Sequence, residues 1–178
     1  MVDVRVRILD EDEWQLYREV RLAALQDAPD AFVARFEDEG SYGDDFWREQ
    51  MTRAHRIVAE RGDEPVGLVS LGLHNEELES GEVFGLWTAP TVRGQRVGWD
   101  LVSTASQKAA ETGCRLLYFW VGSDNASAVS FASSFGFRPA ERRTVRVADG
   151  APEKDADEVA MVLPVSSDPS QTTNPYLP

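Results

Sequence analysis

The sequence predicts one domain of the α/β (α+β) class, because segments with strand periodicity and segments with helix periodicity follow one another along the chain. Three strand-like segments precede a long helical segment at residues 99–112, and a nearly continuous apolar strand follows at residues 114–121. The 178 residues match the length of one domain, about 100–200 residues. A hydrophobic content of 42% supports a folded core.

The individual elements are predicted from periodicity and from their stop signals. Strands are expected at residues 2–9, 56–60, 65–74, 82–88, 114–121, 137–148 and 158–163. Helices are expected from Asp10 or Asp12 to Gln26, from Asp44 or Asp45 onward, at residues 99–112, and at residues 125–135, where Gly136 is the C-cap. We expect an irregular connection at residues 36–43, an acidic hairpin turn at 75–81, and a mobile tail at 165–178 that follows the domain of residues 1–164.

Composition limits the partners of the chain. Lys and Arg total 18 against 31 Asp and Glu, so the net charge is −13. Such a surface repels nucleic acid and anionic membranes, and no apolar run approaches the roughly 18 residues of a membrane span. The alternating N-terminus lacks the apolar stretch of a signal peptide, and the single cysteine, Cys114, cannot form an internal disulfide, so we expect a cytoplasmic protein. His55 and His74 have no partners at metal-ligand spacing, so no metal is expected.

Residues 88–100, T-A-P-T-V-R-G-Q-R-V-G-W-D, are the most informative stretch. They combine the end of a strand, a tight turn and the start of a helix. The first N–H groups of a helix have no partner inside it, and the helix dipole makes that end partially positive, so the turn predicts an anion site. Gly94 and Gly98 allow close approach to the backbone, while Arg93 and Arg96 add two cations. A generic glycine turn before a helix is the alternative.

The order strand, R-G-Q-R-V-G, helix resembles the acyl-CoA pyrophosphate loop of the GNAT (GCN5-related N-acetyltransferase) superfamily. The family pattern is Gln or Arg, two residues, Gly, one residue, then Gly or Ala. Arg93 matches its first position and Gly98 its last, but Arg96 replaces the middle glycine, so its side chain must point away from the phosphates or lie along them as a cation. Asn125 followed by S-F-A-S-S-F-G-F resembles another family pattern, and the resemblance covers residues 4–163.

This resemblance implies a mixed, twisted sheet of about seven strands with helices on both faces. It also implies an N-acetyltransferase that uses acetyl-CoA, no metal, and a small-molecule or peptide amine acceptor, and it raises a homodimer as a candidate assembly. Backbone at the end of the strand would pair with pantetheine and face the thioester oxygen, and the loop would hold the pyrophosphate. The implied cofactor-binding residues are Leu86, Trp87, Thr88, Arg93, Gly94, Gln95, Arg96, Val97, Gly98, Trp99 and Asn125. Asn125 would either cap its helix or bond the pantetheine.

Two proton transfers complete the expected chemistry. Glu82 is a candidate base for the attacking amine, or else an edge-strand solubility charge. The family often has a tyrosine general acid four residues before the Gly of its Gly-Phe pair, but here that position is Ala132. Ser133 or Ser134, acting through water, and Tyr118 are candidate substitutes.

The sequence leaves alternatives open for the identity of the acceptor and for the activity. Glu37 and Glu39 could bind the amine as counter-charges or could form a solvated turn. Acidic segments at residues 37–45 and 149–158 suggest the hypothesis of a cationic acceptor. Because Arg96 and Ala132 depart from the family pattern, the alternatives to an acetyltransferase are a non-catalytic acyl-CoA-binding module and a transferase for a larger acyl group.

Overall fold

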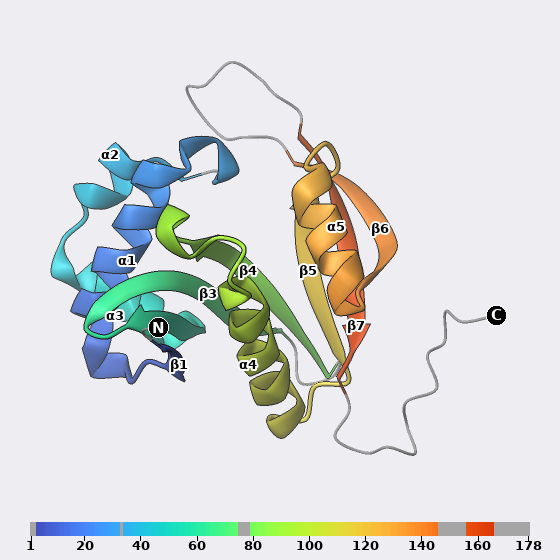
Figure 1. The fold of residues 1–178 in the computed structure, drawn as a ribbon, viewed down its shortest axis with the longest axis horizontal. Helices are drawn as coiled ribbons and strands as arrows, with labels where there is room; N and C mark the ends of the chain where they lie inside the picture. The colour runs from blue at the N-terminus through green and yellow to red at the C-terminus, as the bar shows by residue number, and fades with distance from the viewer. Residues whose placement is uncertain (1–2, 33, 75–78, 146–155, 166–178) are drawn as a thin grey trace. The chain divides into compact units, whose positions relative to one another are not determined.

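A computed structural model of the chain describes residues 3–32, 34–74, 79–145 and 156–165. Its strands are β1 (Val4–Ile8), β2 (His55–Arg61), β3 (Glu64–His74), β4 (Ser80–Thr88), β5 (Leu116–Gly122), β6 (Arg138–Val145) and β7 (Ala156–Pro164). Its α-helices are α1 (Trp14–Asp27), α2 (Phe36–Gly40), α3 (Asp44–Arg53), α4 (Val97–Glu111) and α5 (Ala126–Phe135). Short 3-10 turns occur at Glu11–Glu13, Pro29–Ala31 and Pro90–Val92 (Figure 1).

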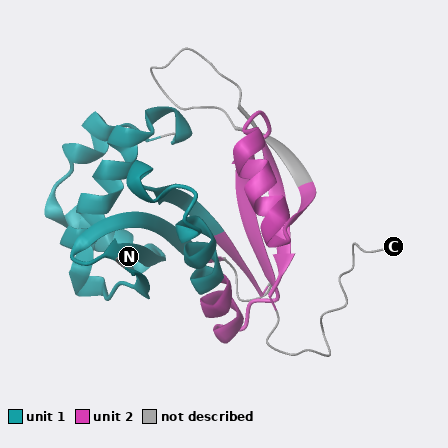
Figure 2. Cartoon of the chain, viewed as in Figure 1, with its two compact units in different colours: residues 1–72, 83–105 teal, residues 73–82, 106–178 magenta. Residues whose placement is uncertain are grey.

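The seven strands form an open, mostly antiparallel sheet in the order β1-β2-β3-β4-β5-β7-β6. The chain divides into two compact units (Figure 2). The first unit contains residues 1–72 and 83–105, and the second contains residues 73–82 and 106–178. Among the described residues, no helix is both long enough and apolar enough to cross a membrane.

Helices cover both faces of the sheet in the first unit. Val58 pairs with Leu68 and Ala59 with Gly67, so these two pairs point to opposite faces. Val58 and Leu68 face a core that α1 and α3 supply. That core also contains Leu9, Trp14, Tyr17, Val20, Ala24, Trp47, Met51 and Trp87. On the other face, a Cβ built on Gly67 would come within 2.9 Å of Leu101, which places α4 there.

A buried arginine stabilises the first of these faces. The guanidinium of Arg56 donates hydrogen bonds to the carbonyl of Gln50 and, at 2.7 Å, to the hydroxyl of Ser70. Its Cζ lies 4.5 Å from the ring centre of Tyr17 and 5.6 Å from that of Phe84. Burial lowers the pKa of Arg56, and the two aromatic faces attract the charge that burial disfavours.

The second unit is organised by the two ends of α5. The side chain of Asn125 accepts a hydrogen bond from the N–H of Ala128 and so caps the first turn. Gly136 ends the helix at a φ of 122°, and the N–H of Phe137 then bonds the carbonyl of Ala132. Phe137 is fully buried and meets Phe119 of β5 edge-on, with ring centres 5.9 Å apart.

Most predicted elements are confirmed, although several ends shift by about two residues: β4 begins at Ser80, inside the predicted turn of residues 75–81, and β5 begins at Leu116. Three further differences concern the helices and the tail. The predicted irregular connection at residues 36–43 is wrong, because Phe36–Gly40 forms α2. Helix α4 begins at Val97, two residues before the predicted start, so Gly98 lies in its first turn. Val165, at the start of the predicted tail, is buried and donates its N–H to the carbonyl of Arg115. The rest of that tail, residues 75–78 of the predicted acidic turn and residues 146–155, which include most of the acidic segment 149–158, lie outside the described residues.

Gly67 should resist substitution because residues from three elements, α4, β2 and β4, approach it closely. A Cβ there would lie 2.9 Å from Leu101, 3.2 Å from Ala59 and 3.3 Å from the carbonyl of Trp87. We expect Gly67→Ala to lower the free energy of unfolding by about 1–3 kcal/mol, as overpacking usually does. Urea denaturation measures this. Gly40→Ala is the control, since its Cβ would meet only Leu22, at 3.9 Å; equal losses in both variants would contradict the packing described here.

Candidate functional site

The end of β4 is irregular, and the irregularity is centred on Gly85. Phe84 and Trp87 are three residues apart, which in a regular strand would place them on opposite faces. Both nevertheless face the α1 side: the guanidinium of Arg56 contacts both Phe84 and Tyr17 of α1, and the indole N–H of Trp87 bonds Asp27. Gly85 has a φ of 64°, the left-handed region that inverts the alternation. The strand therefore departs from regular β geometry at Gly85.

The loop after β4 presents backbone N–H groups at the start of α4. The N–H groups of Arg93 and Gln95 bond the carbonyls of Pro90 and Val92. Within the part of the chain that the structure describes, the N–H groups of residues 96–98 donate to no backbone carbonyl. Because α4 has 15 residues, its dipole makes this end partially positive. Unsatisfied donors at a long helix's N-terminus form an anion site.

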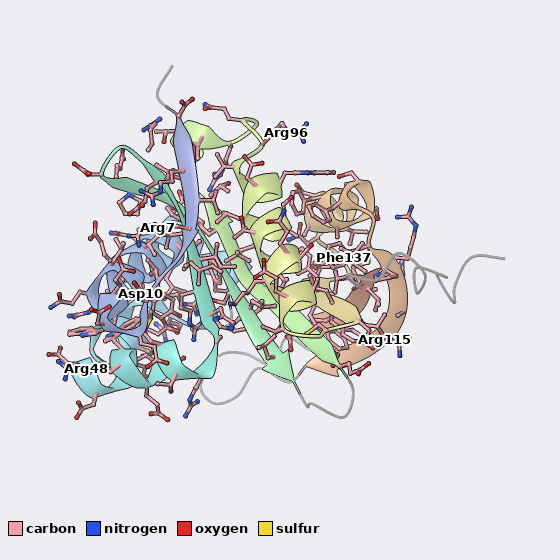
Figure 3. The ribbon with its side chains drawn as sticks, turned by 90° about the horizontal axis from the view of Figure 1, so that it is seen from below. Arg7, Asp10, Arg48, Arg96, Arg115 and Phe137 are labelled. Carbon is pink, nitrogen blue, oxygen red and sulfur yellow. The ribbon has the colours of Figure 1, made fainter. Side chains whose placement is uncertain are left out.

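Arg96 holds the loop in a conformation that normally requires glycine. Its φ is 66°, and it and Glu79 are the non-glycine residues with positive φ in the described chain. Its guanidinium lies over the ring of Trp99, with the Cζ 5.3 Å from the ring centre. The arginine therefore stays on the surface at the helix start (Figure 3), where its charge adds to that of the helix terminus.

Arg93 is held by two acceptors. Its Nε donates to the carbonyl of Thr88 at 3.2 Å, and its Nη2 donates to Oδ2 of Asp27. The same oxygen accepts the indole N–H of Trp87 at 2.9 Å. The hydrogen bond from Trp87 and the charge-assisted bond from Arg93 hold the pKa of Asp27 below its ordinary value. Half of the Arg93 side chain remains exposed, so its guanidinium can still reach an anion at the loop.

The first unit brings together most of the predicted cofactor-binding residues, because all but Asn125 lie on β4, the loop and the start of α4. Val97 is buried, whereas Gln95 is exposed and donates to the carbonyl of Thr91. Asn125, in the second unit, caps α5 as one of its two predicted roles requires. Asp27 was missed by the sequence analysis, and no local signal identifies it, since its partners are 60 and 66 residues away.

The predicted proton-transfer residues belong to the second unit. Glu82 is partly buried near the start of β4, Tyr118 is partly buried on β5, and Ser133 lies on α5. Ala132 is fully buried, and its carbonyl accepts the N–H groups that end the helix. The position of the family's tyrosine therefore contributes to the core of this chain. The roles of Glu82, Tyr118 and Ser133 stay predictions.

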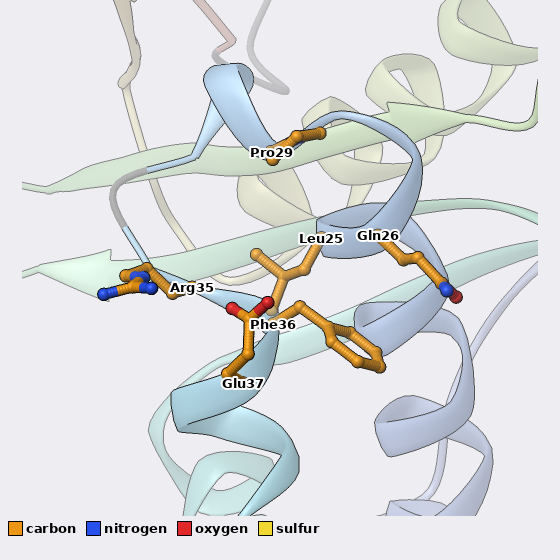
Figure 4. A pocket seen from close by; sticks show the side chains of 6 residues that line it. All are labelled: Leu25, Gln26, Pro29, Arg35, Phe36 and Glu37. Atoms are coloured by element: carbon orange, nitrogen blue, oxygen red, sulfur yellow. The ribbon is translucent and has the colours of Figure 1, made fainter.

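The two predicted substrate carboxylates differ in environment. Glu39 forms a bidentate ion pair with Arg21, at 2.9 and 3.0 Å, and the side chain of Glu39 is only 12% exposed. This pair joins α2 to α1. Glu37 instead lines an open pocket of about 550 Å³ at the ends of α1 and α2 (Figure 4). Among the described residues, no cluster of His, Cys, Asp or Glu could hold a metal ion.

Comparison with known protein families shows which family the chain belongs to. The sequence model of the Acetyltransferase (GNAT) family matches residues 12–137, which is more than half of the chain. The chain belongs to the GNAT acetyltransferase family. The match includes the irregular end of β4 and the loop at the start of α4.

Two curated acetyltransferases match about half of the chain. An uncharacterized N-acetyltransferase of Methanocaldococcus jannaschii is 31% identical over 89 residues, which are 48% of this chain and 39% of that protein. The mycothiol acetyltransferase of Corynebacterium efficiens is 37% identical over 84 residues, which are 47% of this chain and 28% of that protein. The matched part thus spans well under half the length of either relative.

Solved acetyltransferase structures share the fold over nearly the whole chain. The ribosomal-protein-alanine N-acetyltransferase of Brucella melitensis has a TM-score of 0.66 at 22% identity, covering 90% of this chain and 99% of that one. YncA of Salmonella typhimurium, solved with its cofactor acetyl-CoA, has a TM-score of 0.66 at 17% identity, covering 93% and 96%. A spermidine N-acetyltransferase chimera from Vibrio cholerae and hSSAT has a TM-score of 0.67 at 18% identity, covering 90% and 94%.

The left-handed conformation of Arg96 should cost stability whenever a Cβ is present. Arg96→Gly and Arg96→Ala both remove the contact with Trp99, so they differ only in the backbone strain and the flexibility of glycine. We expect Arg96→Gly to be the more stable variant by about 1 kcal/mol. Thermal unfolding of the pair measures the difference. An alanine variant as stable as the glycine variant would contradict the assigned φ.

The ion pair of Asp27 should make stability depend on pH in a defined direction. The pKa of Asp27 is lower in the folded chain than its ordinary value of 3.8, so its charged form favours folding. This contribution is complete above about pH 5 and is lost as the pH falls through the folded pKa. In urea denaturation, Asp27→Asn should therefore be less stable than the wild type at pH 7, with the difference shrinking below pH 4. A constant difference down to pH 3 would show that the charge contributes nothing.

Proposed function

We propose that this GNAT chain transfers an acetyl group from acetyl-CoA to a primary amine, which attacks the thioester directly. The observation that carries the proposal is the loop at the start of α4, where the N–H groups of residues 96–98 lack backbone acceptors. Arg93 and Arg96 stand on either side of Gly94, whose backbone approach is unobstructed, since a Cβ there would meet nothing within 4 Å. This set of donors fits a pyrophosphate.

The other contacts with acetyl-CoA would come from backbone. Leu86, Trp87 and Thr88 follow the irregularity at Gly85, so their polar groups are candidates to pair with the amides of the pantetheine arm. One N–H of this segment would face the thioester oxygen and stabilise the charge that develops on it. When bound, acetyl-CoA supplies an activated acyl carbon. The chain itself supplies orientation and donors.

Proton transfer would be shared between carboxylate and hydroxyl groups. The amine must lose a proton to react, and Glu82 is the candidate acceptor. The leaving thiol has a pKa near that of cysteine, about 8.5, so it departs near neutral pH without a strong acid. Ser133 or Tyr118 would therefore assist rather than determine turnover, which fits the alanine at position 132.

A non-catalytic acyl-CoA-binding module is the second candidate, and one observation favours it. Ala132 is fully buried and carries no acid at the position of the family's tyrosine. Binding of acetyl-CoA without turnover of any amine would support this alternative.

A thermal-shift titration with acetyl-CoA and CoA tests the cofactor site. At 100 times the dissociation constant, binding adds about 2.7 kcal/mol, which should raise the melting temperature by roughly 5–10 °C for a chain of this size. Arg93→Gln should weaken the shift, because Arg93 flanks the donors of the loop. Arg5→Gln, an exposed β1 residue, is the matched control and should keep it. No shift in the wild type would refute the proposed function.

A further inference from the structure

The open pocket at the ends of α1 and α2 offers one charge of each sign beside an apolar surface. Its lining residues are Leu25, Gln26, Pro29, Arg35, Phe36 and Glu37, all from the first unit. Three of these are apolar, one is an amide, one is a cation and one is an anion. Figure 4 shows the Glu37 carboxylate directed toward Leu25, with the Arg35 guanidinium and the Phe36 ring to either side of it.

The two charged groups are available to a ligand. Neighbouring carboxylates are already engaged: Glu39 is paired with Arg21, and Asp27 with Arg93. Arg35 and Glu37 are both exposed and form no ion pair with another side chain of the described residues. Arg35 is the N-cap residue of α2 with extended backbone, and Glu37 lies in its first turn. Since no ion pair joins Arg35 to Glu37, each charge can still bind its own partner.

From this arrangement we infer that the pocket binds an amino carboxylate, a molecule that carries an amine and a carboxylate on an apolar body, such as an amino acid or a short peptide with a free C-terminus. The guanidinium of Arg35 binds the carboxylate of the ligand. Its apolar body packs against Leu25, Pro29 and Phe36, and Glu37 attracts its ammonium group. A polyamine fits this pocket poorly, since Arg35 repels every one of its charges. The inference rests on the proposed function in that the bound molecule is the acetyl acceptor.

Matched pairs of acceptors separate the role of the carboxylate from that of the amine. L-leucine, L-phenylalanine and alanyl-phenylalanine are each compared with their C-terminal amides, with spermidine as the polycation. Initial rates follow the release of CoA, and calorimetry with the CoA-loaded protein measures binding independently of turnover. The rates are measured near neutral pH, where the amine of an amide is deprotonated to a larger extent than that of the free acid, so faster reaction of the acids there cannot arise from amine basicity.

We expect kcat/KM and binding to favour at least one carboxylate over its amide by about tenfold, the usual value of one charge-assisted contact. Arg35→Gln should abolish that preference while leaving the amides unaffected. Glu37→Gln should lower kcat/KM and weaken binding for acids and amides alike. Arg5→Gln removes the same charge from exposed β1 and should change neither.

Equal rates and equal binding for acids and amides in all three pairs would overturn the inference, as would a preference that survives in Arg35→Gln. A preference for spermidine over all three acids would overturn it in favour of a polycationic acceptor. The acetyl-CoA thermal shift involves neither Arg35 nor Glu37, so its presence or absence reports on the proposed function separately. If no amine is acetylated, the calorimetric comparison still decides whether the pocket selects a carboxylate.

Discussion

The carboxylate of Asp27 joins three parts of the first unit, and the candidate site depends on this junction. Its Oδ2 accepts hydrogen bonds from Trp87 at the end of β4 and from Arg93 in the following loop. An acidic residue at the last position of a helix is unfavourable by about 0.3–1 kcal/mol, because the helix dipole is negative there. The indole N–H and the guanidinium offset that cost. The presence of an aspartate at position 27 is therefore explained by its bonds to Trp87 and Arg93, and not by helix stability.

Two departures from regular backbone shape the surface that this junction supports. Gly85 inverts the alternation of β4, so that Phe84 and Trp87 share a face, and Arg96 turns the chain into α4 at a positive φ. The first requires glycine, while the second imposes strain on an arginine. Strained residues persist when their surroundings hold them, and they concentrate at functional sites. Here the cation of Arg96 stands beside unsatisfied N–H donors, where glycine would supply the same turn without a charge.

Features set by neighbouring residues were predictable from the sequence, and features set by distant ones were not. The caps of α5 at Asn125 and Gly136 and the strand β1 follow from local patterns, as does the position of the turn before α4. Helix α2 was not predicted because its five residues are too few to show periodicity, and its acidic run resembles a turn. In the structure these acidic residues lie in the first turn of the helix, where the helix dipole stabilises negative charge. The partners of Asp27 and the pairing of Arg21 with Glu39 join residues far apart in the sequence, which no pattern of spacing reveals.

The end of α1 contributes to two separate surfaces at once. Leu25, Gln26 and Pro29 line the pocket that also holds Arg35 and Glu37, whereas Asp27, between them, holds Arg93 at the loop before α4. Asp27 lies between two pocket residues in the sequence, but its side chain contacts Arg93 and does not line the pocket. This is possible because successive residues at a helix end point in different directions. Any shift of this short segment would move the pocket wall and the anchor of Arg93 together. In this chain the geometry of the pocket and that of the loop before α4 are therefore fixed by the same turn of backbone.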